Sequence, residues 1–139
     1  MKLSKKTAYA LKTVLELALN GEQKLMSVPQ ISARQDIPTS FLEQILLMLK
    51  GTGFVGSKRG QHGGYYLAVA PDKITMAAVV QLTEGGLQFS DNPDHTCPIQ
   101  EVWNKISLGV AEQLESTTIA DLCARYQERN QMNSIGYFI

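Results

Sequence analysis

The residues best suited to binding chemistry lie in the stretch KRGQHGGYYLA, positions 58–68. Two cations, Lys58 and Arg59, stand beside Gly60, and two further glycines precede a pair of tyrosines. Glycine permits tight turns and close approach of the backbone to a ligand. An arginine at a hairpin tip can enter the narrow minor groove of DNA, where the negative potential is strongest. The pattern predicts a β-hairpin with a basic tip, its first strand within 53–60 and its second from Tyr65 onward.

Two other interpretations of this stretch were weighed against the DNA-binding hairpin. A phosphate-binding nucleotide loop would require the spacing G-x-x-x-x-G-K-[ST] followed by a helix, whereas here a strand is expected to follow. A surface hairpin without a ligand is the other alternative, and it leaves the basic tip without a role. His62 lies at the same tip and is interpreted as a weak DNA contact, not as a metal ligand.

The segment before the hairpin predicts two helices separated by a tight turn. VPQISARQ, residues 28–35, follows Ser27 and has Pro29 in its first turn. Pro38 disfavours helical geometry at the residue before it, and TSFLEQILLMLK, residues 39–50, then restarts the helical period. Its apolar stripe is Leu42, Ile45, Leu46 and Leu49, and Ser40 with Glu43 is interpreted as a capping box. This arrangement is typical of the helix-turn-helix motif.

The start of the second helix carries the side chains that would reach DNA. A helix N-terminus presents backbone N–H groups to phosphates, while its first exposed side chains reach base edges. Gln44 could pair with adenine, Glu43 could accept from cytosine N4, and a hydroxyl could hold a phosphate. Glu43 as a mere cap and Phe41 as a core residue are the alternatives. With the hairpin tip, the predicted DNA-binding residues are Thr39, Ser40, Phe41, Glu43, Gln44, Lys58, Arg59 and Gly60.

The formal net charge is zero, but charge is divided unevenly along the chain. Residues 1–60 hold nine Lys or Arg and four Asp or Glu, a net charge of +5. Residues 61–139 hold four cations and nine anions, a net charge of −5. A basic region of this kind offers one attractive face to a polyanion such as double-stranded DNA. Chance clustering on solvated surfaces is the alternative.

The C-terminal part predicts a long helix that opens at Pro98. A continuous apolar stripe this far from the N-terminal core needs a partner, and the segment 117–128 of the same chain is one candidate. The stripe is formed by Ile99, Val102, Trp103, Ile106, Val110 and Leu114.

The expected fold is mainly α-helical with a small β-hairpin wing. With 139 residues the chain can bury a core without disulfides or metals. We expect a winged helix-turn-helix domain over 1–84, a turn-rich loop over 85–98, and helices with a tail over 99–139. No apolar run approaches membrane-spanning length, so we expect a cytoplasmic protein with no membrane partner. No set of nucleophile, base and orienting residue is found, so catalysis is not expected.

The two cysteines, Cys97 and Cys123, form no C-x-x-C pair, so neither a zinc site nor a disulfide framework is predicted. Cys97 lies near a helix N-terminus, where a thiol pKa can be lowered, and it is therefore a thiol-sensor candidate. The alternatives are that Cys97 is inert and that Cys123 is an ordinary core residue.

Residues 28–68 closely resemble the signature of the Rrf-two family of bacterial winged helix-turn-helix regulators, and the likeness extends over nearly the whole chain. The runs SFLEQIL and RGQHGGYYLA are specific. The resemblance implies a homodimeric transcriptional regulator, by default a repressor, on a partly palindromic operator. It also implies that 85–98 is a sensor-type loop and that 99–139 holds dimerisation helices and a tail, with the apolar stripe from Ile99 to Leu114 as the dimerisation surface. It places Ser40, Phe41, Glu43 and Gln44 in the major groove and Arg59 in the minor groove.

Four departures from relatives of the family concern its chemistry. Phe41 replaces the tyrosine usual there, so a phenolic hydrogen bond to DNA would be missing. In the family, three cysteines of the loop before the dimerisation helix bind an iron-sulfur cluster, whereas here that loop has only Cys97. Gln100 stands where a related regulator supplies a histidine, and Ala8 cannot serve as the acidic ligand of some relatives.

We therefore predict no cofactor, and an effector that the sequence does not identify. Two alternative functions remain open on the sequence. One is a redox-responsive or iron-sulfur-responsive regulator with unconventional ligands, for which the nearby residues are Cys97, His95, Asp94 and Asp91. The other is a winged-helix protein-interaction module that no longer binds DNA.

Overall fold

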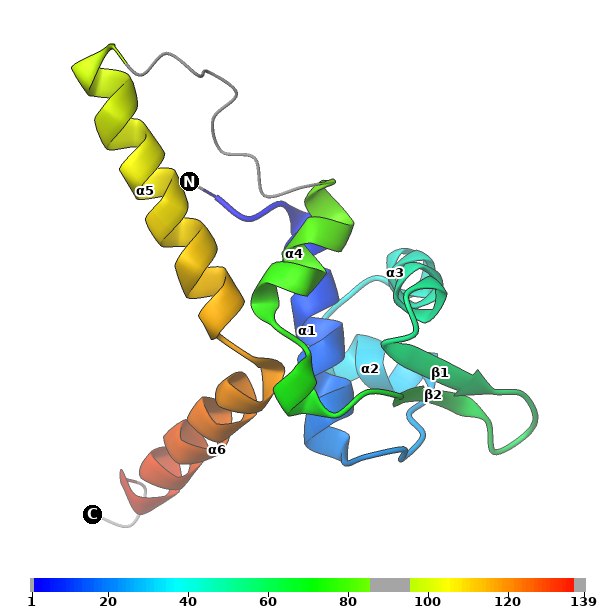
Figure 1. Cartoon of the computed structure of the whole chain (residues 1–139). Helices are drawn as coiled ribbons and strands as arrows, with labels where there is room; N and C mark the ends of the chain where they lie inside the picture. Colours follow the sequence, from blue (N-terminus) through cyan, green and yellow to red (C-terminus); the bar gives the residue numbers. More distant parts are fainter. Residues whose placement is uncertain (1, 86–95, 137–139) are drawn as a thin grey trace.

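The computed structural model describes residues 2–85 and 96–136, with side chains described to residue 133. Over these ranges the chain forms six α-helices, a short 3-10 helix and one antiparallel β-hairpin (Figure 1). In chain order the elements are α1 Lys5–Asn20, α2 Val28–Gln35, α3 Thr39–Gly51, β1 Val55–Lys58, β2 Gly64–Leu67, η1 Pro71–Lys73, α4 Met76–Glu84, α5 Pro98–Ser116 and α6 Ile119–Gly136. The predicted fold class, mainly α-helical with a hairpin wing, is confirmed.

Helix α1 is the centre of the N-terminal body, and α2, α3, α4 and α6 pack around it. The predicted stripe of α3 is confirmed, because Leu42, Ile45, Leu46 and Leu49 are all buried in the core. Burying one such leucine contributes about 1.5–3 kcal/mol relative to leaving it exposed. Consequently one face of α3 is fixed against the body and the opposite face is left to solvent.

The ends of the helices follow from local capping chemistry. Helix α1 begins after Ser4, whose Oγ accepts a hydrogen bond from the backbone N–H of Thr7 at 3.2 Å. It ends at Gly21, whose φ of 106° suits glycine. Helix α2 begins with a reciprocal capping box between Ser27 and Gln30.

The capping box expected at Ser40 and Glu43 is wrong. Helix α3 already begins at Thr39, with Pro38 in the N-cap position and no side-chain hydrogen bond at the cap. The carbonyl of Pro38 accepts the first helical bond from the N–H of Leu42 at 2.9 Å. Ser40 therefore lies inside the first turn, where its backbone is helical and its hydroxyl cannot cap the helix. Glu43 is consequently not engaged in a cap.

The wing is attached to the body through one backbone bridge. Strands β1 and β2 pair from Val55↔Leu67 to Lys58↔Gly64. Beyond this pairing, Met26 and Tyr65 exchange two backbone hydrogen bonds, each 2.8 Å long. Gly64 permits the approach, since a Cβ at this position would lie 2.5 Å from the carbonyl oxygen of Met26. The bridge ties the wing to the segment between α1 and α2.

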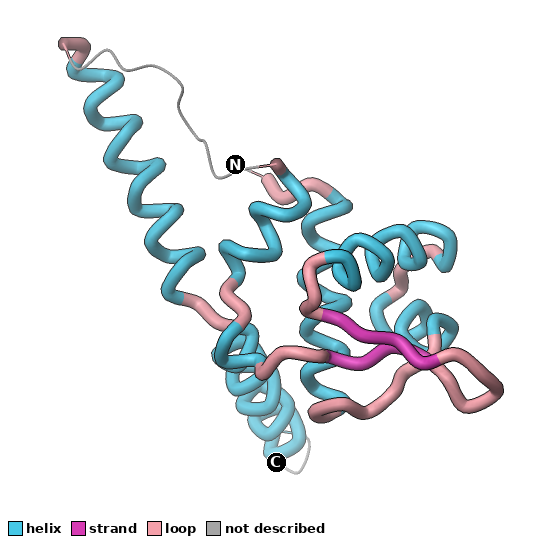
Figure 2. Tube along the Cα trace, turned by 45° about the vertical axis from the view of Figure 1, so that its right-hand side comes forward, coloured by secondary structure: helices cyan, strands magenta, loops and turns pink. Residues whose placement is uncertain are grey.

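The two C-terminal helices diverge from each other. Helix α5 leaves the body beyond its contact with α4, whereas α6 returns to pack on α1 and η1 (Figures 1 and 2). Ile119 at the start of α6 is fully buried in the same core as α1 and α3. Pairing of α5 with the segment 117–128 along its length, one of the two alternatives above, is therefore not what the structure shows.

None of the helices within the described ranges combines the length and the apolar character needed to cross a lipid bilayer.

Candidate nucleic-acid interface

The exposed face of α3 carries most of the residues predicted from its sequence. Thr39, Ser40, Glu43 and Gln44 are all exposed. Residues three and four positions apart share one side of a helix, so Ser40, Glu43 and Gln44 form a single polar surface at its N-terminal half. The surface lies opposite the buried leucine stripe, and its three side chains are exposed in the described part of the chain.

Phe41 differs from these residues because it is only half exposed. Its ring packs against the core and lies edge to face with the ring of Tyr9 on α1. Both roles considered for Phe41 in the sequence are compatible with this position. It supports the first turn of α3 and still borders the polar surface.

The turn between α2 and α3 is held by three hydrogen bonds. Ser32 donates its hydroxyl to the carbonyl of Ile37 at 2.6 Å, and its own carbonyl accepts from the backbone N–H groups of Asp36 and Ile37. Asp36 adopts the left-handed conformation, with φ 53° and ψ 49°, and Ile37 is buried. Because of these bonds, α2 and α3 form one unit, as a helix-turn-helix motif requires.

The cations of the wing tip are exposed to solvent and are not paired with a carboxylate of the described residues. Lys58, Arg59 and Gly60 are exposed, as are Gln61 and His62. Gly60 has a φ of 118°, and its carbonyl accepts a hydrogen bond from the N–H of Gly63 at 3.0 Å, which closes the tight turn. Within the parts of the chain that the structure describes, neither Lys58 nor Arg59 forms an ion pair. Their charges are thus available to an external polyanion.

A second exposed surface runs along α5. No residue of this helix is buried, and four apolar side chains of the predicted stripe have exposed fractions between 45% and 80%. These four are Ile99, Val102, Trp103 and Ile106, while Val110 and Leu114, nearer the body, are half-buried. An exposed apolar surface of this kind marks an interaction site.

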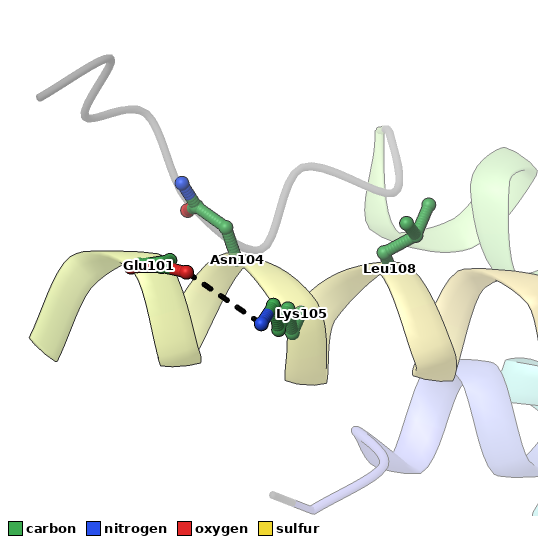
Figure 3. A pocket seen from close by; sticks show the side chains of 4 residues that line it. All are labelled: Glu101, Asn104, Lys105 and Leu108. Carbon is green, nitrogen blue, oxygen red and sulfur yellow. Dashed lines mark ion pairs between the residues drawn. The ribbon is translucent and has the colours of Figure 1, made fainter. Parts of the chain in front are cut away.

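A shallow hollow of about 430 Å³ lies beside α5, at Glu101, Asn104, Lys105 and Leu108 (Figure 3). Glu101 and Lys105 form an ion pair at 3.5 Å across one helical turn, and both side chains are largely exposed. The described residues that line the hollow all come from α5. The lining residues indicate no ligand, because the charges of Glu101 and Lys105 neutralise each other. Sequence reasoning did not single out Leu108, which is 61% exposed.

A helix-turn-helix unit, an exposed polar face on its second helix and a hairpin with unpaired cations together define a winged helix-turn-helix protein of the DNA-binding class. Comparison of the sequence with known protein families leads to the same class. The sequence profile of the Rrf2 (Rrf-two) family, described as iron-dependent transcriptional regulators, matches residues 3–125. The chain belongs to this family.

Relatives and solved structures extend the likeness over nearly the whole chain. The transcriptional regulator CymR of Bacillus subtilis is 34% identical over 132 residues, covering 94% of this chain and 95% of its own. IscR of Erwinia tasmaniensis is 30% identical over 129 residues, covering 88% and 78%. The solved structure of B. subtilis CymR, titled the global cysteine regulator, superposes with a TM-score of 0.82 at 32% identity, covering 90% and 98%. The structure of T. potens IscR gives 0.80 at 31%, covering 93% and 90%.

These relatives are transcriptional regulators and not enzymes, and this chain is likewise a regulator with a winged-helix DNA-binding fold.

Because the family is described as iron-dependent, we tested whether the described residues fit an iron-sulfur cluster. Cys97 is the half-buried N-cap residue of α5, and Cys123 lies beyond the far end of this 19-residue helix, whose length is about 28 Å. His95, Asp94 and Asp91 lie outside the described residues. Among those that are described, no three His, Cys, Asp or Glu side chains are grouped so that they could hold a metal ion. The described residues do not fit a cluster held by several thiolates.

Cys123 is half-buried against the core, and burial raises the pKa of its thiol. This environment is that of an unreactive packing residue. Its position agrees with the interpretation of Cys123 as an ordinary core residue.

Proposed function

We propose that this chain is a homodimeric repressor that binds a partly palindromic DNA operator through α3 and the wing. The observation that carries the proposal is the exposed polar face of α3 beside a wing whose cations have no ion-pair partner in the described parts of the chain. A repressor of this type blocks a promoter by occupying it. The protein would act in the cytoplasm, where it reaches bacterial DNA.

Each proposed contact follows from the chemistry of one side chain. Gln44 pairs with the N6 and N7 atoms of adenine, and Glu43 accepts a hydrogen bond from cytosine N4. The hydroxyls of Thr39 and Ser40 hold phosphates at the N-terminus of α3, with Phe41 packed beside them. Arg59 enters the minor groove, Lys58 neutralises a phosphate, and Gly60 allows the backbone to approach the duplex.

Dimerisation is proposed through the apolar stripe of α5, formed by Ile99, Val102, Trp103, Ile106, Val110 and Leu114. The described part of the chain leaves the first four of these exposed, which supports a second copy as the partner. Twofold pairing of α5 would set the distance between the two DNA-binding bodies. They would then bind two half-sites about 34 Å apart, which is one turn of the double helix. The partly palindromic operator follows from this symmetry.

The signal is proposed to act at Cys97, at the junction of the 85–98 segment and α5, where a peroxide would oxidise the thiolate to a sulfenic acid and itself be reduced, releasing hydroxide or water. Its position at the N-cap of α5 and its partial exposure support this role. A metal-responsive regulator is the second candidate, which the family description favours. In that case Cys97 and His95 would belong to an unconventional ligand set.

The test is a titration of the purified protein against labelled genomic fragments, with binding measured at several salt concentrations. We expect preferred fragments with a partly palindromic sequence and affinity that falls linearly on a log–log plot against salt. Sedimentation of the protein alone should give the mass of a dimer. A protein-interaction module without DNA binding would show no preferred fragment, and that result would overturn the proposal.

A further inference from the structure

Glu16 is a carboxylate held inside the helix-turn-helix body. It lies on α1 and is only 5% exposed. Arg34 donates from Nη1 to its Oε1 at 3.0 Å, and Gln35 donates from Nε2 to its Oε2 at 2.6 Å. Both donors lie in the last turn of α2. One carboxylate therefore fixes two consecutive residues at the end of α2 against α1.

Stability alone does not account for a charge at this position. Burying a carboxylate costs desolvation energy, and well-packed apolar residues in place of a buried ion pair are often neutral or stabilising. Arg34 and Gln35 do not need Glu16 as a hydrogen-bond acceptor, because solvent can take its place. The side chain of Arg34 is 64% exposed, and Gln35 is only half-buried. Arg34 and Glu16 also border a shared hollow of about 310 Å³. An apolar residue would fill the site but would supply no directional bond.

The end of α2 is connected rigidly to the start of α3. Asp36 and Ile37 follow Gln35, and the hydrogen bonds of both to Ser32 hold the turn in one conformation. Pro38 then forms the N-cap of α3. Any rotation of the last turn of α2 about α1 therefore moves the polar face that starts at Thr39.

We propose that Glu16 is a positioning residue for DNA recognition, because its two hydrogen bonds set the orientation of the α2–α3 unit on α1. The inference rests on the proposed DNA-binding function. Glu16 itself touches no base or phosphate. Its role is to hold the face with Ser40, Glu43 and Gln44 in the orientation that fits the major groove.

The test compares Glu16→Gln with the wild-type chain in operator binding, in discrimination between operator and scrambled DNA, and in thermal unfolding. Glutamine keeps the size of the side chain but not its charge or its two acceptor oxygens. We expect operator affinity to fall about tenfold, comparable to the loss of one base contact. Affinity for scrambled DNA and the unfolding midpoint should stay unchanged, so discrimination should fall as well.

The matched control is Glu22→Gln, which removes the same charge from the exposed segment between α1 and α2. Electrostatics alone predicts that loss of either negative charge raises the affinity for DNA or leaves it unchanged. We therefore expect the operator affinity of Glu22→Gln to rise or stay unchanged, and that of Glu16→Gln to fall. Equal behaviour of the two variants would overturn the inference.

A second variant, Glu16→Met, separates positioning from folding. It is expected to unfold at the same or a higher temperature than the wild type and still to lose operator discrimination. If both Glu16 variants unfold, or lose stability with discrimination intact, then Glu16 is only structural and the inference fails. If the wild-type chain selects no DNA fragment, the proposed function itself fails and this inference falls with it.

Discussion

The rings of Tyr9 and Phe41 meet edge to face, with centroids 5.4 Å apart and planes at 80°. Tyr9 lies on α1 and Phe41 in the first turn of α3, so this contact joins the proposed DNA-binding end of α3 to the central helix. Because edge-to-face pairs are attractive beyond their buried area, the contact stabilises one orientation of that turn. A tyrosine at position 41 could make the same contact and add a hydroxyl.

Replacing Phe41 with Ala is expected to lower the free energy of unfolding by about 1–3 kcal/mol, since the ring is half-buried and pairs with Tyr9. Urea unfolding followed by circular dichroism measures the change. The control, Phe41→Tyr, keeps the ring contact and is expected to remain within about 0.5 kcal/mol of the wild type. Unchanged stability of Phe41→Ala would show that the aromatic contact contributes nothing.

Arg59→Ala is expected to weaken operator binding by about 1–3 kcal/mol while the proposed dimer stays intact. The salt dependence should also decrease, by about one unit of slope if the guanidinium displaces one counterion. Fluorescence anisotropy across a range of salt concentrations gives both values. Lys73→Ala, which removes an exposed cation from η1, serves as the control and should leave affinity nearly unchanged. Equal affinities of Arg59→Ala and wild type would count against the wing contact.

Glu84 joins the end of α4 to the start of α1, 80 residues away in sequence from Ser4. The hydroxyls of Ser4 and Thr7 donate to its Oε1 at 2.6 and 2.5 Å and hold the pKa of this carboxyl below its ordinary value of 4.5. A lowered pKa means that ionised Glu84 stabilises the fold above pH 4.5 and that this contribution is lost as pH falls through the lowered pKa.

Glu84→Gln is therefore expected to unfold at a lower temperature than the wild type at pH 7, with the difference shrinking as the pH drops below 4.5. Thermal unfolding from pH 3 to pH 7 checks this. Asp72→Asn, at an exposed position of η1, provides the comparison. A difference between Glu84→Gln and wild type that is independent of pH would argue that ionisation of Glu84 is not involved.

Much of the DNA-binding unit could be predicted because its determinants are local. The stripe of α3 and the glycines of the wing each act within a few residues, and the structure has them as expected. The cap of α3 was misplaced because Pro38 is itself compatible with the N-cap position, which moves the helix start ahead of Ser40.

The determinants that could not be predicted are tertiary. Glu16 is a charged residue on a helix and, by its sequence, belongs on the solvated side. Its burial depends on Arg34 and Gln35, which reach it only after α2 has packed on α1. The same holds for Ile119, which enters the core because the backbone around Thr117 bonds to Ile74 and Met76.

Protein purified without oxygen is expected to show no visible absorbance from an iron-sulfur cluster. Such clusters need several protein ligands, usually thiolates, and Cys123 is separated from Cys97 by the length of α5. An ultraviolet-visible spectrum together with an iron assay provides the measurement. A visible band that disappears in Cys97→Ser would contradict this prediction and would favour the ligand set of Cys97 with His95.

Trp103→Glu is expected to convert the proposed dimer to a monomer, because it places a charge in the centre of the apolar stripe of α5, where burial without a partner is costly. Sedimentation equilibrium gives the mass, and operator affinity should fall as the two half-sites are no longer bound together. The matched control is Leu108→Glu, an equally exposed apolar residue on the opposite side of the same helix. Since both substitutions add the same charge to α5, only the side of the helix differs. A dimer that survives Trp103→Glu, or that is lost in Leu108→Glu alone, would place the interface elsewhere.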